Sequence, residues 1–160
     1  MMASGAMPER PTHNDTKINN VLLDDATGEG ICVIDLDTLM PGSALYDFGD
    51  MVRSATINVE EDSPDWRGVV CRPEIFKALA DGFCAGGFLT EAEKGNLALG
   101  GALMTLECGV RFLTDYLEGD HYFRIHRPAH NLDRCRTQFA LVRSILAQRD
   151  ELQGYVEGRK

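Results

Sequence analysis

The spacing of hydrophobic residues changes along the chain, and the change separates a short β-ribbon from a longer helical part. Two apolar runs, Val21–Leu23 and Ile31–Ile34, flank a segment rich in Asp and Gly, which is typical of a β-hairpin. Beyond Gly42, apolar residues recur every three or four positions, as they do on one face of a helix. The pattern therefore predicts one short hairpin followed by helices.

About four helices are predicted after the hairpin. Thr90 and Glu93 have the spacing of a capping box, and Pro73 stands where a helix accepts proline in its first turn. Together with the apolar spacing, these signals place the helices at Ala44–Thr56, Pro73–Phe83, Thr90–Leu117 and Asn131–Tyr155. The predicted fold class is α+β and mostly α.

The composition fits one folded domain. The chain has 160 residues, of which 44% are hydrophobic and 26% are charged, as in ordinary globular proteins. This length is sufficient for one buried core. Residues 1–12 show no hydrophobic pattern, so we expect a disordered tail there and one folded unit over residues 13–160.

Charge and cysteine content narrow the possible partners and the location. The net charge of −9 disfavours nucleic acid and anionic membranes, because both require a basic surface. We recognise no signal peptide and no apolar run long enough to span a bilayer, and the five cysteines have no CxxC spacing. We therefore expect reduced thiols in a cytoplasmic protein.

The segment His13–Asn20 has the H-x-D-x-x-x-x-N spacing of kinase catalytic loops. In such a loop, Asp15 is predicted to accept or orient the hydroxyl of the substrate, and Asn20 is predicted to bind Mg²⁺ through its side-chain oxygen. Lys17 is expected to meet the transferred phosphate as a point charge. His13 is expected to brace the loop by hydrogen bonding.

Two further aspartates follow the loop. Asp35 ends an apolar strand 20 residues after Asp15, where a kinase places its metal-binding aspartate. An amide and a carboxylate, completed by phosphate oxygens and water, suit Mg²⁺. Asp47-Phe48-Gly49 spells the DFG motif of protein kinases, but it lies too far downstream and inside a predicted helix. We interpret Asp47 as a structural acid that caps the backbone of the catalytic loop.

These motifs together resemble the aminoglycoside phosphotransferase and choline kinase superfamily, through His13–Asn20, Ile34-Asp35 and Tyr46–Asp50. The phrases HNDTKINNVLLD, VIDLDT, RFLTDYLEGDHYF and NLDRCRTQF are most similar to the N-acetylhexosamine 1-kinases. The resemblance implies a protein-kinase-like C-terminal lobe, ATP and Mg²⁺ as cofactors, and phosphoryl transfer to the hydroxyl of a sugar or another small alcohol. It also implies that Asp15 is the base and that Asn20 and Asp35 bind magnesium.

Several residues are candidate substrate contacts. Arg111 forms either an ion pair with Asp115 one helical turn away or, together with Asp115 and Tyr116, a contact with sugar hydroxyls; the resemblance favours the second reading for Arg111 alone. Asp37 is a further candidate, and it stands where antibiotic kinases have glycine, which disfavours an aminoglycoside substrate. Other charged residues are interpreted as surface or local charge pairs: Arg53, Glu60, Glu61, Asp62, Arg124, Arg127, Arg134 and Arg136.

Only twelve residues precede His13, so we expect the N-terminal ATP-binding lobe to be absent and the chain to be inactive or nearly inactive alone. An alternative is a non-catalytic kinase remnant or interaction module. Such a module would form a homodimer through the apolar surface left by the missing lobe, or pair with a separate N-lobe chain. A metal-dependent hydrolase would need more ligands than the sequence offers.

Overall fold

The computed structural model describes residues 5–158, and helices dominate this part of the chain. The strands are β1 (Arg10–Thr12), β2 (Val21–Leu23), β3 (Gly30–Val33) and β4 (Met40–Gly42). The helices are α1 (Ala44–Thr56), α2 (Pro73–Ala85), α3 (Glu91–Lys94), α4 (Leu97–Glu118), α5 (His130–Ala147) and α6 (Arg149–Val156). The predicted class, α+β and mostly α, is confirmed.

The strands form two separate antiparallel pairs. β2 pairs with β3 as a hairpin, with Val21 opposite Val33, as the sequence predicts. β1 pairs with β4, with Arg10 opposite Gly42, and Thr12 at its end is buried. The expectation of a disordered tail over residues 1–12 is therefore wrong for residues 10–12, because they form a strand and the side chains of Arg10 and Thr12 have hydrogen-bond partners. Residues 1–4 of that tail lie outside the described residues.

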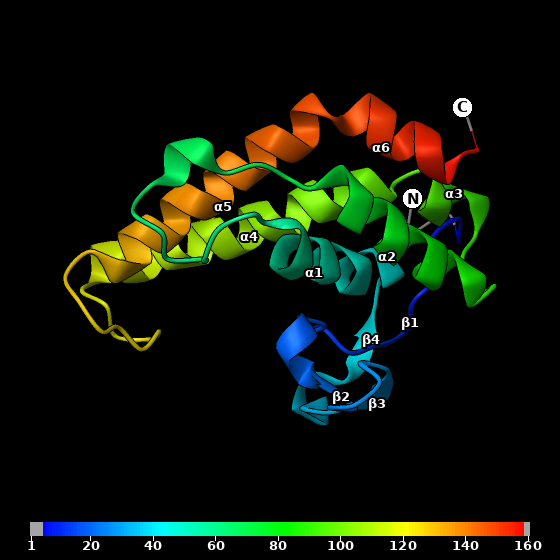
Figure 1. The fold of residues 1–160 in the computed structure, drawn as a ribbon, viewed down its shortest axis with the longest axis horizontal. Helices are drawn as coiled ribbons and strands as arrows, with labels where there is room; N and C mark the ends of the chain where they lie inside the picture. The colour runs from blue at the N-terminus through cyan, green and yellow to red at the C-terminus, as the bar shows by residue number, and fades with distance from the viewer. Residues whose placement is uncertain (1–4, 159–160) are drawn as a thin grey trace.

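Figure 1 shows α4 running through the helical body, with α1 on one side and α5 on the other, while the β2–β3 hairpin lies below α1. By length and composition α4 is apolar enough to cross a membrane, which the sequence interpretation overlooked. Half of the relevant stretch is buried inside the fold. Its contacts with α1 and α5 make it the core helix of this domain.

The core fixes α1 firmly against its neighbours. Phe48 of α1 is fully buried, and its ring meets the ring of Phe76 from α2 edge-on, with 5.4 Å between their centroids. Leu97, Leu141 and Ile145, from α4 and α5, are also fully buried. Each such side chain contributes about 2–3 kcal/mol of transfer free energy. α1 therefore provides a rigid position for Asp47, which lies in its first turn.

The helix boundaries differ from the prediction at two places. Thr90 and Glu93 do form a capping box, but the helix that they open is α3, which ends at Lys94, and α4 begins separately at Leu97. The predicted last helix is divided into α5 and α6 at Gln148, whose side-chain amide donates to the carbonyl oxygen of Cys71. The described residues thus contain six α-helices rather than about four.

Candidate active site

Asp47, in the first turn of α1, binds the backbone of the loop that follows β1. The two oxygens of this carboxylate accept the backbone N–H groups of His13 (2.9 Å) and Asn14 (2.8 Å). Asn14 has a positive φ of 61°, a strained conformation for a residue with a side chain. The carboxylate of Asp47 thus fixes the backbone of the loop by two hydrogen bonds.

His13 ties the same loop to the hairpin. Its Nε2 donates to the carbonyl oxygen of Ile34 over 2.9 Å, and its Nδ1 accepts the N–H of Asp15 over 3.3 Å. Asn20 at the end of the loop accepts the N–H of Ile34 on its own backbone oxygen, over 2.9 Å. Both ends of the loop therefore meet the residue that precedes Asp35.

Asp15 is presented by this loop as an ionised carboxylate. Its Oδ2 accepts hydrogen bonds from Nζ of Lys17 (2.7 Å) and from Nδ2 of Asn20 (2.8 Å). Partial burial opposes ionisation, but these hydrogen bonds and the charges of Lys17 and Arg53 outweigh it and hold the pKa of Asp15 below its usual value. The side chain keeps about a quarter of its exposure (27%), so a substrate can reach it.

Asn20 directly precedes β2, and its backbone oxygen accepts the N–H of the residue before Asp35, so both candidate ligands lie at the same end of the hairpin. Because Nδ2 of Asn20 donates to Asp15, its Oδ1 is the atom left to bind a cation. The hydrogen bond and the charge of Asp37, together with Asp15, raise the pKa of Asp35. The charge of Lys17 opposes this rise only in part, so the carboxylates of Asp35 and Asp37 repel each other and favour a bound cation.

The residues present fit a magnesium ion that is shared with a nucleotide. Asn20 and Asp35 supply an amide and a carboxylate oxygen, which are hard ligands of the kind that Mg²⁺ prefers. Among residues 5–158, no three His, Cys, Asp or Glu side chains converge to hold a metal ion by themselves. An ion at this place would thus need phosphate oxygens and water to complete its shell.

A cavity of about 510 Å³, called here the acceptor cavity, opens beside Asp15. The loop supplies Asp15 and Lys17, and α1 supplies Arg53. The far wall comes from α4, α5 and the segment between them. The charged residues that line it are Asp15, Lys17, Arg53, Glu61, Arg111, Arg124 and Arg134. This volume is suited to a small molecule of sugar size.

The aromatic part of the acceptor cavity is positioned by Asp115. Its carboxylate accepts the backbone N–H groups of His121, Tyr122 and Phe123 over 2.7–2.9 Å, and Nδ2 of Asn131 over 2.8 Å. Burial opposes ionisation, yet the three backbone donors hold the pKa of Asp115 below its usual value. The segment that carries Tyr122 and Phe123 is therefore fixed to α4 and α5.

Several expected substrate contacts are placed differently from the sequence interpretation. Asp115 is buried, and its oxygens are occupied by the contacts above, so it is not available to a substrate. Arg111 does line the acceptor cavity, but its ion-pair partner is Glu107 (3.7 Å) rather than Asp115. Tyr116 is not among the lining residues, whereas Tyr122 is. Asp37 is exposed, interacts with Asp35, and is not among the lining residues, although its neighbour Thr38 is.

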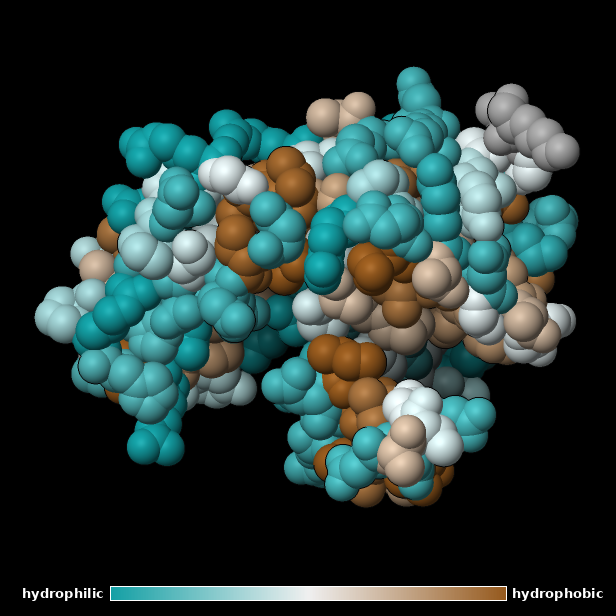
Figure 2. Space-filling view, viewed as in Figure 1, coloured by the Kyte–Doolittle hydropathy of each residue, from teal (hydrophilic) through white to brown (hydrophobic). Residues whose placement is uncertain are grey.

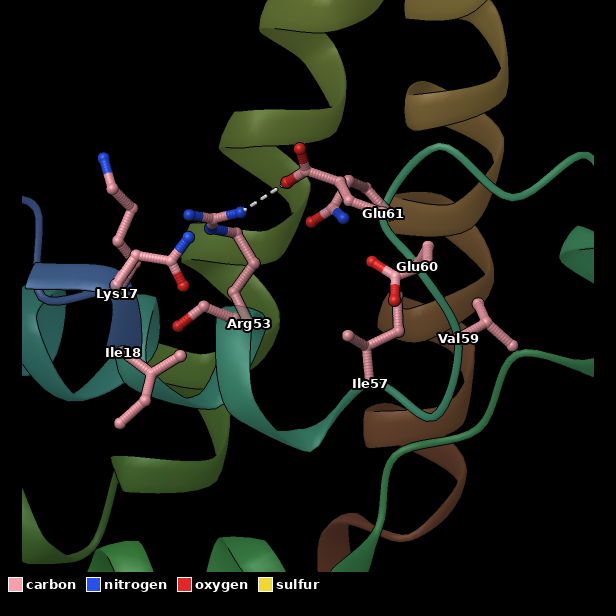
Figure 3. A pocket seen from close by; sticks show the side chains of 10 residues that line it. Lys17, Ile18, Arg53, Ile57, Val59, Glu60 and Glu61 are labelled. Carbon is pink, nitrogen blue, oxygen red and sulfur yellow. Dashed lines mark hydrogen bonds and ion pairs between the residues drawn. The ribbon is translucent and has the colours of Figure 1, made fainter. Parts of the chain in front are cut away.

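Arg53 and Glu61 are site residues that the sequence interpretation missed. Arg53 is nearly buried and bonds Asp50 and Glu61, each over 2.8 Å. In Figure 3, Arg53 lies between Lys17 and Glu61, at a second cavity of about 350 Å³ that Ile18 and Ile57 also line. Arg53 was interpreted as a surface pair because the sequence shows only its neighbour Asp50. The contact with Glu61 depends on how the acidic loop folds back.

The match to known proteins agrees with this arrangement. The described residues form a mostly helical domain whose loop and hairpin carry Asp15, Asn20 and Asp35. The sequence model of the phosphotransferase enzyme family matches residues 2–83, just over half of the chain. The chain therefore belongs to this family. The matched part contains the loop, the hairpin, α1 and nearly all of α2, while Arg111, Arg124 and Arg134 lie beyond it.

Proposed function

We propose that this chain carries the acceptor-activating and metal-binding residues of an ATP- and Mg²⁺-dependent kinase that acts on the hydroxyl group of a sugar. The observation that supports this most strongly is the geometry of Asp15. An ionised carboxylate, held by Lys17 and Asn20, faces a cavity of the size of a small molecule. The motifs shared with N-acetylhexosamine 1-kinases make an N-acetylhexosamine the first substrate to test.

In this proposal, Asp15 aligns the acceptor hydroxyl and takes its proton as the new oxygen–phosphorus bond forms, while the bond between the γ-phosphorus and the bridging oxygen breaks and ADP leaves. Lys17 lies within 2.7 Å of the carboxylate, so its charge is close to the incoming phosphoryl group. Asn20 and Asp35 hold the magnesium ion, which neutralises charge on the phosphates. Asp47 and His13 keep the loop backbone in place, and position contributes much of the rate in such reactions.

The test is the substitution Asp15→Asn, which keeps the shape of the side chain but removes the base. We expect transfer of phosphate from ATP to N-acetylhexosamines to fall by about 100-fold or more. Turnover is followed by product formation from labelled ATP, which also detects slow transfer.

Asp25→Asn is the matched control, because Asp25 is an exposed acid in the turn of the hairpin. It should leave the rate unchanged. Turnover that survives in Asp15→Asn would show that Asp15 is not the base. Loss of turnover in both variants would point to a general effect of charge rather than to the proposed role.

A second candidate function is a non-catalytic interaction module that forms a homodimer. It is favoured by exposed apolar side chains on and beside the β2–β3 hairpin, among them Ile31 (64% exposed), Leu36 (55%) and Leu39 (55%). Figure 2 shows several brown side chains on this part of the surface. Sedimentation velocity distinguishes the candidates: a dimer that dissociates in Ile31→Asp supports the module, and a monomer at all concentrations excludes it.

A further inference from the structure

The acceptor cavity is strongly positive in a chain whose net charge is −9. Five of its lining residues are cations, namely Lys17, Arg53, Arg111, Arg124 and Arg134, whereas the acids that line it are Asp15 and Glu61. Surfaces of one charge concentrate ligands of the opposite charge. The excess of cations in the acceptor cavity therefore indicates that its ligand carries negative charge.

Two of the five cations are already neutralised within the fold. Lys17 pairs with Asp15 over 2.7 Å. Arg53 pairs with Asp50 and with Glu61, over 2.8 Å in each case. Neither side chain is therefore assigned to the acceptor: Arg53 is paired twice, and Lys17 is the cation assigned to the transferred phosphoryl group.

The other three guanidinium groups keep most of their charge. Arg111 meets Glu107 only at 3.7 Å, on the surface. Arg134 meets Glu61 at 3.8 Å, and its buried Nε has no hydrogen-bond partner. Arg124 has no ion pair with any of the residues that the structure describes. A buried donor without a partner costs free energy. Nε of Arg134 therefore favours a ligand that supplies an acceptor, because it has no hydrogen-bond partner within the described residues.

Two of the three arginines, Arg134 and Arg111, are also held in place. Arg134 lies over the ring of Phe112, with 5.4 Å to its centroid, and donates to Oδ1 of Asn131 and to the backbone oxygen of Arg124. Arg111 lies over Phe123 at 5.4 Å. Planar guanidinium groups fixed in this way suit the two oxygens of a carboxylate or phosphate. We call Arg111, Arg124 and Arg134 the arginine cluster.

We propose that the acceptor substrate carries an anionic group, a phosphate ester or a carboxylate, which the arginine cluster binds while the reacting hydroxyl faces Asp15. This inference rests on the proposed kinase function and refines its substrate class. A neutral N-acetylhexosamine would leave the three charges unpaired, and a cationic alcohol would be repelled. A sugar phosphate or sugar acid is therefore a better substrate than the neutral sugar.

The test is binding of small probes to the 160-residue chain by calorimetry, without nucleotide. Glucose 6-phosphate and glucuronate are compared with glucose and N-acetylglucosamine. We expect the anionic probes to bind about ten-fold tighter or more, and the difference to shrink at high salt. Equal affinity for charged and neutral sugars would overturn the inference.

Two substitutions locate the binding. Arg124→Gln and Arg134→Gln should each weaken the anionic probes by about ten-fold and leave the neutral sugars unchanged. Arg136→Gln is the matched control, because Arg136 pairs with Asp133 and does not line the cavity. Arg124 is exposed and its side chain makes no ion pair with the described residues, so its variant remains informative even if Arg134→Gln fails to fold. If the control weakens binding as much as the cluster variants do, the cluster is not the site.

The bound anion has two possible sources, the acceptor substrate or the transferred phosphate of the nucleotide. If glucose 6-phosphate and Mg²⁺-ATP bind together without competition, the anion belongs to the acceptor. If ATP displaces the sugar phosphate and Arg124→Gln weakens both equally, the cluster serves the nucleotide and the inference is wrong. Phosphoryl transfer is measured separately in the Asp15→Asn experiment, so failure of the proposed kinase function would leave the binding result for the arginine cluster unchanged.

Discussion

At the scale of single residues, two aspartates near the acceptor cavity act on backbone rather than on ligands. Asp47 accepts two N–H groups of the catalytic loop, and Asp115 accepts three from the segment that carries Tyr122 and Phe123. Each thus fixes a loop that contributes to the cavity. Charge-assisted hydrogen bonds of this kind are about twice as strong as neutral ones.

The substitution Asp47→Asn tests the role of this residue in the loop. An amide can accept one of the two N–H groups, but its own NH₂ faces the other, so one contact is lost. We expect the free energy of unfolding to fall by about 1–2 kcal/mol. We also expect amide hydrogen exchange at His13 and Asn14 to become about ten-fold faster. Asp65→Asn, at an exposed residue, is the control, and unchanged exchange in Asp47→Asn would contradict the bracing role.

How far the site follows from the sequence depends on the distance between partners along the chain. Asp15, Asn20 and Asp35 are recognised because a loop and a hairpin keep them within about twenty residues. The contacts of Arg134 with Glu61 and with the ring of Phe112 join segments that meet only when α4 and α5 pack together. No local pattern encodes such contacts. Arg124 and Arg134 were for this reason interpreted as local charge pairs, whereas Arg111 was recognised as a candidate substrate contact through the resemblance.

At the scale of elements, the first turns of α1 connect three parts of the fold. Asp47 faces the catalytic loop, Phe48 enters the core, and Gly49 lies against the backbone of Gly100 in α4. The resemblance of these three letters to a kinase motif is therefore misleading, since each residue has a structural contact. The hairpin and the bounds of α1 could be predicted from local patterns, whereas this close approach of two helices could not.

The substitution Gly49→Ala tests the approach of α1 to α4. A Cβ atom here would overlap the carbonyl of Gly100 and Cγ of Met104, which is 2.5 Å away. We expect the free energy of unfolding, measured in urea, to fall by about 2–3 kcal/mol, because overpacking forces the two helices apart. Gly82→Ala in α2 is the matched control. Nothing lies within 4 Å of its Cβ position, so it should be neutral or stabilise the chain by up to about 1 kcal/mol.

At the scale of the whole molecule, one ion pair joins segments 83 residues apart. Arg10 of β1 donates to both carboxylate oxygens of Glu93 in α3, over 3.2 and 2.9 Å. Glu93 also closes the capping box by accepting the N–H of Thr90. Burial opposes its ionisation, but Arg10 and these hydrogen bonds hold the pKa of Glu93 below its usual value. The strand before the catalytic loop is thus fastened to the far end of the helical body.

The pH dependence of stability follows from this pair. A carboxyl whose pKa is lowered on folding stabilises the fold above its unfolded pKa of about 4.3, and this contribution is lost as the pH falls through the lower folded value. We expect Arg10→Gln, which leaves Glu93 buried without its cation, to lower the midpoint of thermal unfolding at pH 7 by about 5 °C. At pH 3 the difference should shrink, because protonation removes the charge that Arg10 compensates. Lys94→Gln, which breaks an exposed pair with Glu91, should change the midpoint by less than about 2 °C at either pH. A deficit in Arg10→Gln that is equally large at both pH values would mean that the packing of the arginine side chain, rather than the ion pair with Glu93, fastens β1 to α3.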